Sequence, residues 1–158
     1  MMMQVVEFNH SDRLRDQLTN FSVDEATSIP WIVRLLENSN SPLALPGDIS
    51  LFNHDCLHIL LGRDRSPESE AYVIGFTMGN DIRCQRIHLW LFKVFALLFY
   101  PPKYRLRWSD LKEFDRGVID GRNLEFKNLN LINFDQLQDY SVSELRKQFR
   151  LASQSDCN

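Results

Sequence analysis

The sequence is poor in cysteine, and the cysteines it has follow no recognisable pattern. Cys56, Cys84 and Cys157 are an odd number in a chain of 158 residues, and no two of them have CxxC spacing. Small secreted domains held together by disulfides carry far more cysteine than this. We therefore expect free thiols in a reducing compartment, and an intracellular protein.

Long apolar runs and long runs of like charge are also missing. The most apolar stretch, residues 87–100, has 14 residues and includes Lys93, whereas a membrane-spanning helix needs about 20 apolar residues. The first residues lack the features of a signal peptide, and a net charge of −3 gives no reason to expect nucleic acid as a partner. We expect a cytoplasmic protein, or a peripheral one on the inner face of a membrane.

Glycine is scarce, with only six residues, while 44% of the chain is apolar. A chain of this length can bury roughly two thirds of its unfolded surface in one core. We find no internal repeat that would divide it. The expected organisation is one helical domain over residues 1–152, followed by a disordered polar tail at 153–158.

Helical periodicity with capping residues recurs along the chain. It predicts helices at residues 11–19, 22–37 (kinked or divided at Pro30), 46–61, from Ser66 onward, 87–100 and 141–151. Residues 39–46 are a predicted loop, and 103–131 contain a helical segment at 109–114, then Gly117, Gly121 and an alternating stretch at 124–127 that fits a loop or a short strand. The expected fold is all-α, a single-domain helical bundle with a metal-binding helical hairpin and an apolar aromatic helix.

The hairpin has the clearest local signals. Gly62 suits the left-handed residue that ends a helix. Ser66 followed by Pro67 is typical of the start of the next helix. A short turn is therefore expected between two helices.

Four side chains in this hairpin form a pattern typical of a divalent-metal site. Successive helical residues turn by about 100°, so His54 and His58 lie about 40° apart around the axis and Asp55 lies about 100° from His54. If the two helices are antiparallel, Glu70 lies opposite His58. Two imidazoles and a carboxylate suit zinc, although magnesium, manganese or iron tolerate the same set. Asp55 is either a further ligand or the acceptor that fixes the tautomer of a histidine.

Other interpretations of these histidines are open. Two histidines four residues apart also occur without metal on solvated helix faces, but a buried cluster without a cation would leave costly unpaired charges. Asp55 stands where the metalloprotease motif HExxH has glutamate, which disfavours proteolysis because a shorter carboxylate reaches less far into the site. His10 and His88 have no place in the pattern, and Cys56, about 200° from His54 around the helix, is expected in the core.

The aromatic helix at 87–100 has two interpretations. It is either core, or a surface that holds a long apolar ligand or a bilayer interface. Basic residues that would suit anionic lipid headgroups flank it at both ends. They are Arg83, Arg86, Lys103, Arg105 and Arg107.

The motif residues resemble the signature of the coenzyme Q biosynthesis protein four family. That signature is matched by His54-Asp55-x-x-His58, Gly62 four residues later, and Glu70 after eleven intervening residues. Phe134-Asp135 followed by Glu144-Leu145-Arg146 resembles the closing helical segment of the same family, so the resemblance covers residues 45–150. It implies an all-helical, lipid-facing protein in which His54, Asp55, His58 and Glu70 hold a divalent metal, usually taken as zinc.

The resemblance also implies an activity. It is the removal of the carboxyl group at ring carbon 1 of a polyprenyl-hydroxybenzoate, with replacement by hydroxyl, which would make the chain a metal-dependent decarboxylase of ubiquinone biosynthesis. The implied partners are a prenylated quinone precursor or other prenyl lipid, a membrane surface and other biosynthetic enzymes. The alternatives are a prenyl-lipid-binding or scaffolding protein without turnover, and a helical interaction module in which the cluster only adds stability.

Overall fold

The computed structural model describes residues 12–21, 45–98 and 106–151. These residues form six α-helices and two short 3-10 helices, and they contain no strand. The predicted all-α fold class is therefore confirmed for this part of the chain. The predicted helix at 22–37, most of the predicted loop at 39–46 and the predicted tail lie outside the described residues.

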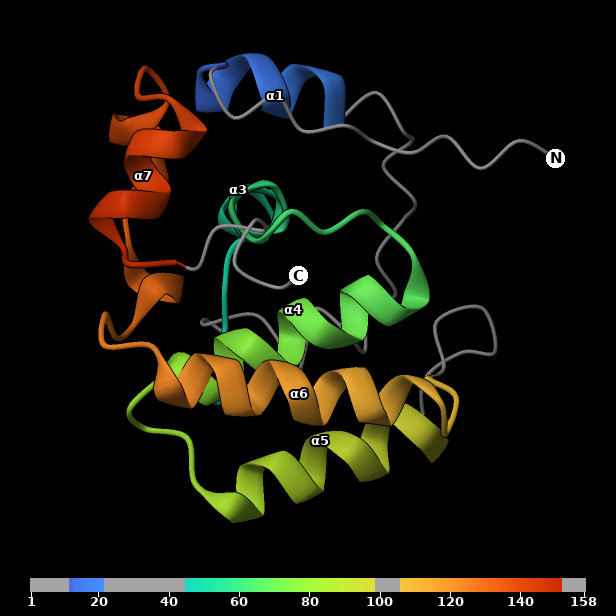
Figure 1. Cartoon of the computed structure of the whole chain (residues 1–158). Helices are drawn as coiled ribbons and strands as arrows, with labels where there is room; N and C mark the ends of the chain where they lie inside the picture. The colour runs from blue at the N-terminus through green and yellow to red at the C-terminus, as the bar shows by residue number, and fades with distance from the viewer. Residues whose placement is uncertain (1–11, 22–44, 99–105, 152–158) are drawn as a thin grey trace, which may run out of the picture.

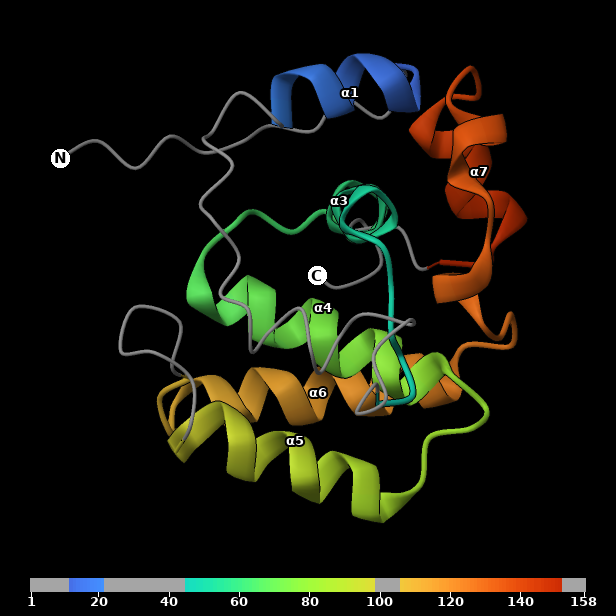
Figure 2. The same cartoon turned by 180° about the vertical axis from the view of Figure 1, so that it is seen from behind.

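The helices fall into two groups in space (Figure 1, Figure 2). In chain order they are α1 (Leu14–Phe21), α3 (Leu51–Leu61), α4 (Pro67–Asn80), α5 (Arg86–Leu98), α6 (Asp110–Asn123), η1 (Leu129–Leu131), η2 (Phe134–Leu137) and α7 (Val142–Gln148). Helices α4, α5 and α6 lie side by side, and α1, α3 and α7 form the rest. None of the described helices has the length and apolarity needed to cross a membrane.

Local capping sets the two helices of the predicted hairpin. The Ser50 hydroxyl accepts a hydrogen bond from the Asn53 N–H at 3.2 Å, so α3 begins at Leu51. The predicted start at Pro46 is wrong, because Gly47 adopts a left-handed φ of 92° in a tight turn against Met78. The end of α3 at a left-handed Gly62 and the start of α4 at Ser66 and Pro67 are confirmed.

Helices α4 and α6 are parallel and packed unusually closely. A Cβ on Gly75 would lie 2.1 Å from the carbonyl oxygen of Phe114, and a Cβ on Gly117 would lie 2.1 Å from that of Tyr72. Gly79 and Gly121 make equally short approaches further along both helices. Only glycine lets two helix backbones come this close.

This packing corrects the prediction for residues 103–131. The predicted helical segment stops at residue 114, whereas α6 continues through Gly117 and Gly121 to Asn123. The two glycines are contact residues and not helix breakers. Residues 124–127 form a loop, so the loop alternative holds and the strand does not.

The remaining predicted helices differ from the structure mainly at their ends. Helix α1 begins at Leu14 and extends to Phe21, against a predicted range of 11–19. Helix α5 matches the aromatic helix but is described only to Leu98. The predicted capping box of α7 is present, since Ser141 and Glu144 bond each other's backbone N–H groups.

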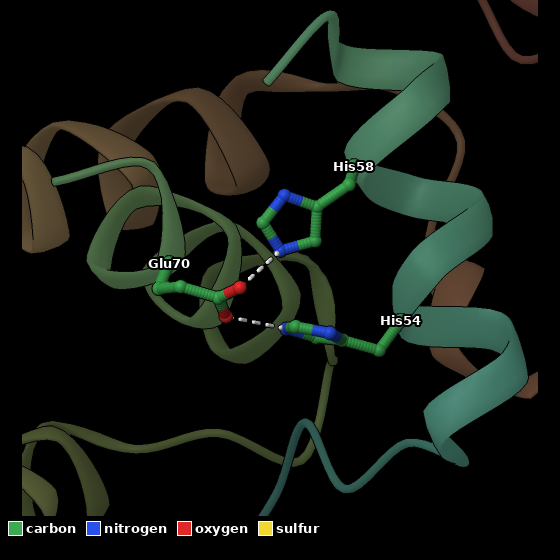
Figure 3. A group of neighbouring side chains, drawn as sticks. All are labelled: His54, His58 and Glu70. Carbon is green, nitrogen blue, oxygen red and sulfur yellow. Dashed lines mark ion pairs between the residues drawn. The ribbon is translucent and has the colours of Figure 1, made fainter. Parts of the chain in front are cut away.

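Two apolar clusters hold these helices in place. The first joins α1, α3, α4 and the C-terminal helices, and includes Leu14, Leu57, Phe134 and Phe149. The second lies between α4, α5 and α6, where the rings of Phe92 and Phe114 stack with centroids 5.0 Å apart. Helix α3 crosses α4 steeply instead of running antiparallel to it (Figure 1, Figure 3).

Candidate metal centre

Three of the four predicted site residues converge where α3 meets the first turn of α4. His54 and His58 project from one face of α3, and Glu70 projects from α4 between them (Figure 3). The Nε2 atom of His54 lies 3.5 Å from Glu70 Oε2, and the Nε2 atom of His58 lies 3.3 Å from Glu70 Oε1. The carboxylate therefore faces both imidazoles at once.

The separations of these atoms suit a single cation. One ligand atom from each of His54, His58 and Glu70 can be chosen so that all three lie within 4.8 Å of one another. Ligand atoms that surround a tetrahedral zinc at about 2.0–2.2 Å are about 3.3–3.6 Å apart. The two imidazole–carboxylate distances, each to a different oxygen of Glu70, fall in that range, and the donor atoms are of the kinds that bind a metal.

His58 has a buried ring nitrogen that forms no hydrogen bond within the described residues. Its side chain is completely buried, and its Nε2 atom has no hydrogen-bond partner among the described residues. Its Nδ1 atom lies 3.3 Å from the carbonyl oxygen of Arg63. An Nδ1–H donated to that carbonyl leaves the Nε2 lone pair facing Glu70, which is the arrangement of a metal-ligating histidine.

Charge in the cluster also suits a cation. Burial lowers the pKa of His54 to about 4, although the Glu70 charge partly opposes this, so His54 is neutral at pH 7. Burial alone would raise the pKa of Glu70, but the two histidines and Arg65 lower it by more, so Glu70 stays ionised. Neutral imidazole and ionised carboxylate are the forms that bind metal.

Asp55 lies at the edge of the site and outside the group of three. Its Oδ1 atom is 4.0 Å from Nδ1 of His54, on the ring edge away from Glu70. Its Oδ2 atom pairs with Nη2 of Arg65 at 3.1 Å. Burial raises the pKa of Asp55, with Arg65 acting in the opposite direction. Of the two predicted roles for Asp55, this position is closer to that of a residue behind a histidine than to that of a ligand.

Two functional neighbours were missed by the sequence reasoning. Arg65 approaches Asp55 from the turn, and its guanidinium lies 4.4 Å from the ring centroid of Phe21 at the end of α1. Phe21 also lies beside His58, with ring centroids 5.6 Å apart. The charge of Arg65 in a short turn next to the motif was a usable signal, whereas nothing local links Phe21 to the site.

A small apolar hollow adjoins His54. It has a volume of about 20 Å³, enough for about one or two water molecules. Its lining residues come from the loop before α3, from α3 itself, from α4 and from α5. They are Leu45, Pro46, Gly47, Asp48, Ile49, His54, Ile74, Thr77, Met78 and Phe92.

The other candidate residues do not take part in the site. Cys56 is fully buried in the core, as predicted, and burial raises the pKa of its thiol to about 12. His88 accepts a hydrogen bond from the Gln85 N–H at 3.0 Å at the start of α5. His10 lies outside the described residues.

Comparison of the chain with family models, curated proteins and solved structures gives no match. Two imidazoles and one carboxylate, on two helices and beside an apolar hollow, can hold a divalent cation with fewer protein ligands than zinc takes in a closed structural site.

Proposed function

We propose that this chain is a divalent-metal protein of ubiquinone or related prenylquinone biosynthesis. His54, His58 and Glu70 hold the cation, with zinc favoured by the mixed nitrogen and oxygen ligands. Asp55 and Arg65 support the site from behind His54. The substrate is a polyprenyl-hydroxybenzoate or a similar prenylated aromatic acid.

One observation carries the metal assignment. The Nε2 atom of His58 is buried without a hydrogen-bond partner and faces a carboxylate at 3.3 Å. Leaving a buried polar atom unpaired costs about 1–3 kcal/mol. A cation between the two histidines and Glu70 would remove that cost and would satisfy all three side chains together.

The chemistry follows from the charges of the residues. A divalent cation in this site would supply a positive charge that stabilises negative charge developing on a bound aromatic acid. Glu70 contributes one negative charge to the site, and Asp55 is balanced by Arg65. The loaded site would therefore carry a net charge of about +1, which attracts an anionic substrate such as a carboxylate.

The quinone assignment rests on the resemblance of the motif. The spacing of His54, Asp55, His58, Gly62 and Glu70 resembles that of the coenzyme Q biosynthesis protein four family. Decarboxylation and hydroxylation at ring carbon 1 is the reaction that this resemblance implies. The apolar hollow beside His54 has a volume of about 20 Å³, so the ring would have to bind outside it.

A second candidate function is prenyl-lipid binding or scaffolding without turnover. The observation in its favour is an exposed apolar stripe on α5, formed by Ile87, Trp90 and Leu98, which are 52%, 59% and 64% exposed. Exposed apolar side chains in such a row are typical of a lipid or partner contact. Arg86 and Arg107, both exposed, lie near the two ends of this stripe and would suit anionic headgroups.

The metal assignment is tested by metal content. Untagged protein purified without chelators is compared by plasma mass spectrometry with His58→Ala and Glu70→Ala. We expect about one zinc per chain in the wild type and a loss of at least tenfold in both variants. Glu68→Ala is the matched control, because Glu68 is exposed in the same turn of α4 and should leave the metal content unchanged.

The outcome also decides between the two functions. Folded wild-type protein that takes up no metal, even with added zinc, would rule out the metal centre. Metal-loaded protein is then incubated with a prenylated 4-hydroxybenzoate and oxygen, and mass spectrometry follows loss of the carboxyl group. Binding of the precursor without conversion would favour the lipid-binding function over the enzyme.

A further inference from the structure

The turn between α3 and α4 carries two arginines that make different contacts. Arg65 pairs with Asp55 at 3.1 Å and rests on the ring of Phe21. Arg63 lies 3.8 Å above the ring centroid of Tyr72 and pairs with Glu113 on α6 at 3.6 Å. One arginine thus serves the candidate metal centre, and the other serves the packing of α4 on α6.

Asp55 pairs with Arg65 and lies near the imidazole edge of His54 that does not face Glu70. The nearer Asp55 oxygen lies 4.0 Å from Nδ1 of His54, whereas Glu70 lies 3.5 Å from the opposite ring nitrogen, Nε2. Asp55 is therefore absent from the set of ligand atoms that lie within 4.8 Å of one another among the described residues. The carboxylate is next to His54 and outside this set.

The contact between Asp55 and Arg65 involves only some of the polar atoms of the two side chains. Asp55 Oδ1 and Arg65 Nε are both buried, and neither has a hydrogen-bond partner among the described residues. A fully engaged pair would form two parallel bonds between guanidinium and carboxylate. Asp55 therefore keeps one unpaired oxygen beside the site, while its other oxygen pairs with Arg65.

We propose that Arg65 is a positioning residue that keeps Asp55 out of the coordination shell, so that the protein supplies three ligands to the cation and not four. Zinc sites with four protein ligands are closed and structural, whereas sites with three leave a position for an exchangeable ligand. Arg65 thereby determines whether the site is open. This inference rests on the proposed metal centre and adds the reason for its coordination number.

Cobalt(II) is the probe for the test, because its visible spectrum reports coordination number and geometry. Metal-free wild type, Arg65→Met, Asp55→Ala and the double variant are titrated with cobalt and then with azide. We expect azide to shift the wild-type spectrum by occupying the open position. In Arg65→Met we expect cobalt to bind roughly tenfold tighter and azide to have no effect, because Asp55 completes the shell.

The other variants separate the possible causes. The double variant Asp55→Ala/Arg65→Met lacks the fourth carboxylate and should regain the azide response. Arg63→Met is the matched control and should behave like wild type. If Arg65→Met does not fold by circular dichroism, Arg65→Gln replaces it with the same expectation.

Two results would overturn the inference. One is an azide response that persists in folded Arg65→Met or Arg65→Gln, and the other is loss of a ligand from the wild-type cobalt spectrum on Asp55→Ala. Failure of the wild type to bind cobalt or zinc is a different result, since it needs no variant. It would remove the metal centre itself, and with it both proposals.

Discussion

At the residue scale, Asp81 is a buried carboxylate that accepts hydrogen bonds from several segments of the chain. Its side chain is fully buried and accepts hydrogen bonds from the Gly47 N–H at 2.8 Å, from Asn130 Nδ2 at 3.2 Å and from Arg83 Nη2 at 2.6 Å. Arg83 also reaches Asp48 at 2.9 Å. Asp81 thus ties the loop before α3, the end of α4 and η1 together, and this loop also lines the hollow beside His54.

We predict that Asp81 makes stability depend on pH. Burial alone would raise its pKa, but hydrogen bonds from Arg83 and Gly47 lower it from 3.8 to about 2. A depressed folded-state pKa contributes stability above the unfolded value, and this contribution is lost as the pH falls from about 4 through about 2. Asp81→Asn should therefore lower the free energy of unfolding at pH 7 by about 2 kcal/mol.

Urea unfolding at several pH values checks this prediction. The difference between wild type and Asp81→Asn should shrink as the pH falls from 5 toward 2.5. Asp139→Asn is the control, because Asp139 is 72% exposed and forms surface pairs with Arg13 and Arg15, so its effect should be small at every pH. A constant difference between wild type and Asp81→Asn would contradict the proposed origin.

The sequence predicted the site residues unequally, for a physical reason. His54 and His58 could be paired because helical periodicity fixes their relative positions locally. Glu70 was expected beside them from an antiparallel pairing of the two helices, whereas in the structure it reaches them although α3 and α4 cross steeply. The position of Asp55 was left open between ligand and supporting residue, since a helical wheel places it within about 100° of His54 either way. What distinguishes the two roles is the contact with Arg65, and no local pattern encodes that contact.

At the element scale, the packing of α4 on α6 is the feature that the sequence did not reveal. The sequence predicts a helical segment only to residue 114, before Gly117 and Gly121, and glycine has poor helix propensity. In the structure they let the backbone of α6 approach that of α4, with partners such as Tyr72 and Phe76. Propensity is a local quantity, and the close approach of a parallel helix is a tertiary one that outweighs it.

We predict that alanine cannot replace these glycines. In Gly117→Ala the new Cβ would lie 2.1 Å from the Tyr72 carbonyl oxygen, so the helices would have to move apart. Overpacking of this kind costs about 1–3 kcal/mol, which exceeds the gain in helix propensity of about 1 kcal/mol. Chemical denaturation should show the loss, with exposed Lys112→Ala on the same helix staying within about 0.5 kcal/mol of wild type. Unchanged or increased stability of Gly117→Ala would contradict this close packing.

At the scale of the whole molecule, the buried and exposed sides of α5 bear on the two interpretations of the aromatic helix. One side packs into the structure, where Phe92 and Ala96 are buried against α6 and its neighbours. Ile87, Trp90 and Leu98 lie within about 80° of one another on the other side, and all three are more than half exposed. The helix is therefore core on one face and exposed on the other, which agrees with its apolar residues being distributed almost all the way round.

The exposed face of α5 leads us to predict that the protein binds a lipid surface. Trp108, just before α6, is 78% exposed, and its backbone neighbour Arg107 is exposed as well. Tryptophan prefers the interface between headgroups and acyl chains, and arginine attracts anionic headgroups. We predict that the protein sediments with vesicles that contain about one third phosphatidylglycerol. Trp90→Ala/Trp108→Ala should weaken this binding roughly a hundredfold, because each indole that enters the lipid interface contributes about 1.5 kcal/mol.

A matched control tests whether the weaker vesicle binding is specific to these two tryptophans. Leu131 is 61% exposed in η1, so Leu131→Ala removes an equally exposed apolar side chain from a different element and should bind vesicles like wild type. Equal loss in Leu131→Ala and the double tryptophan variant would mean that exposed apolar area in general drives binding. If the wild type does not sediment with vesicles at low salt, the predicted membrane contact is ruled out. The metal centre would be unaffected, because His54, His58 and Glu70 lie on α3 and α4 and not on α5.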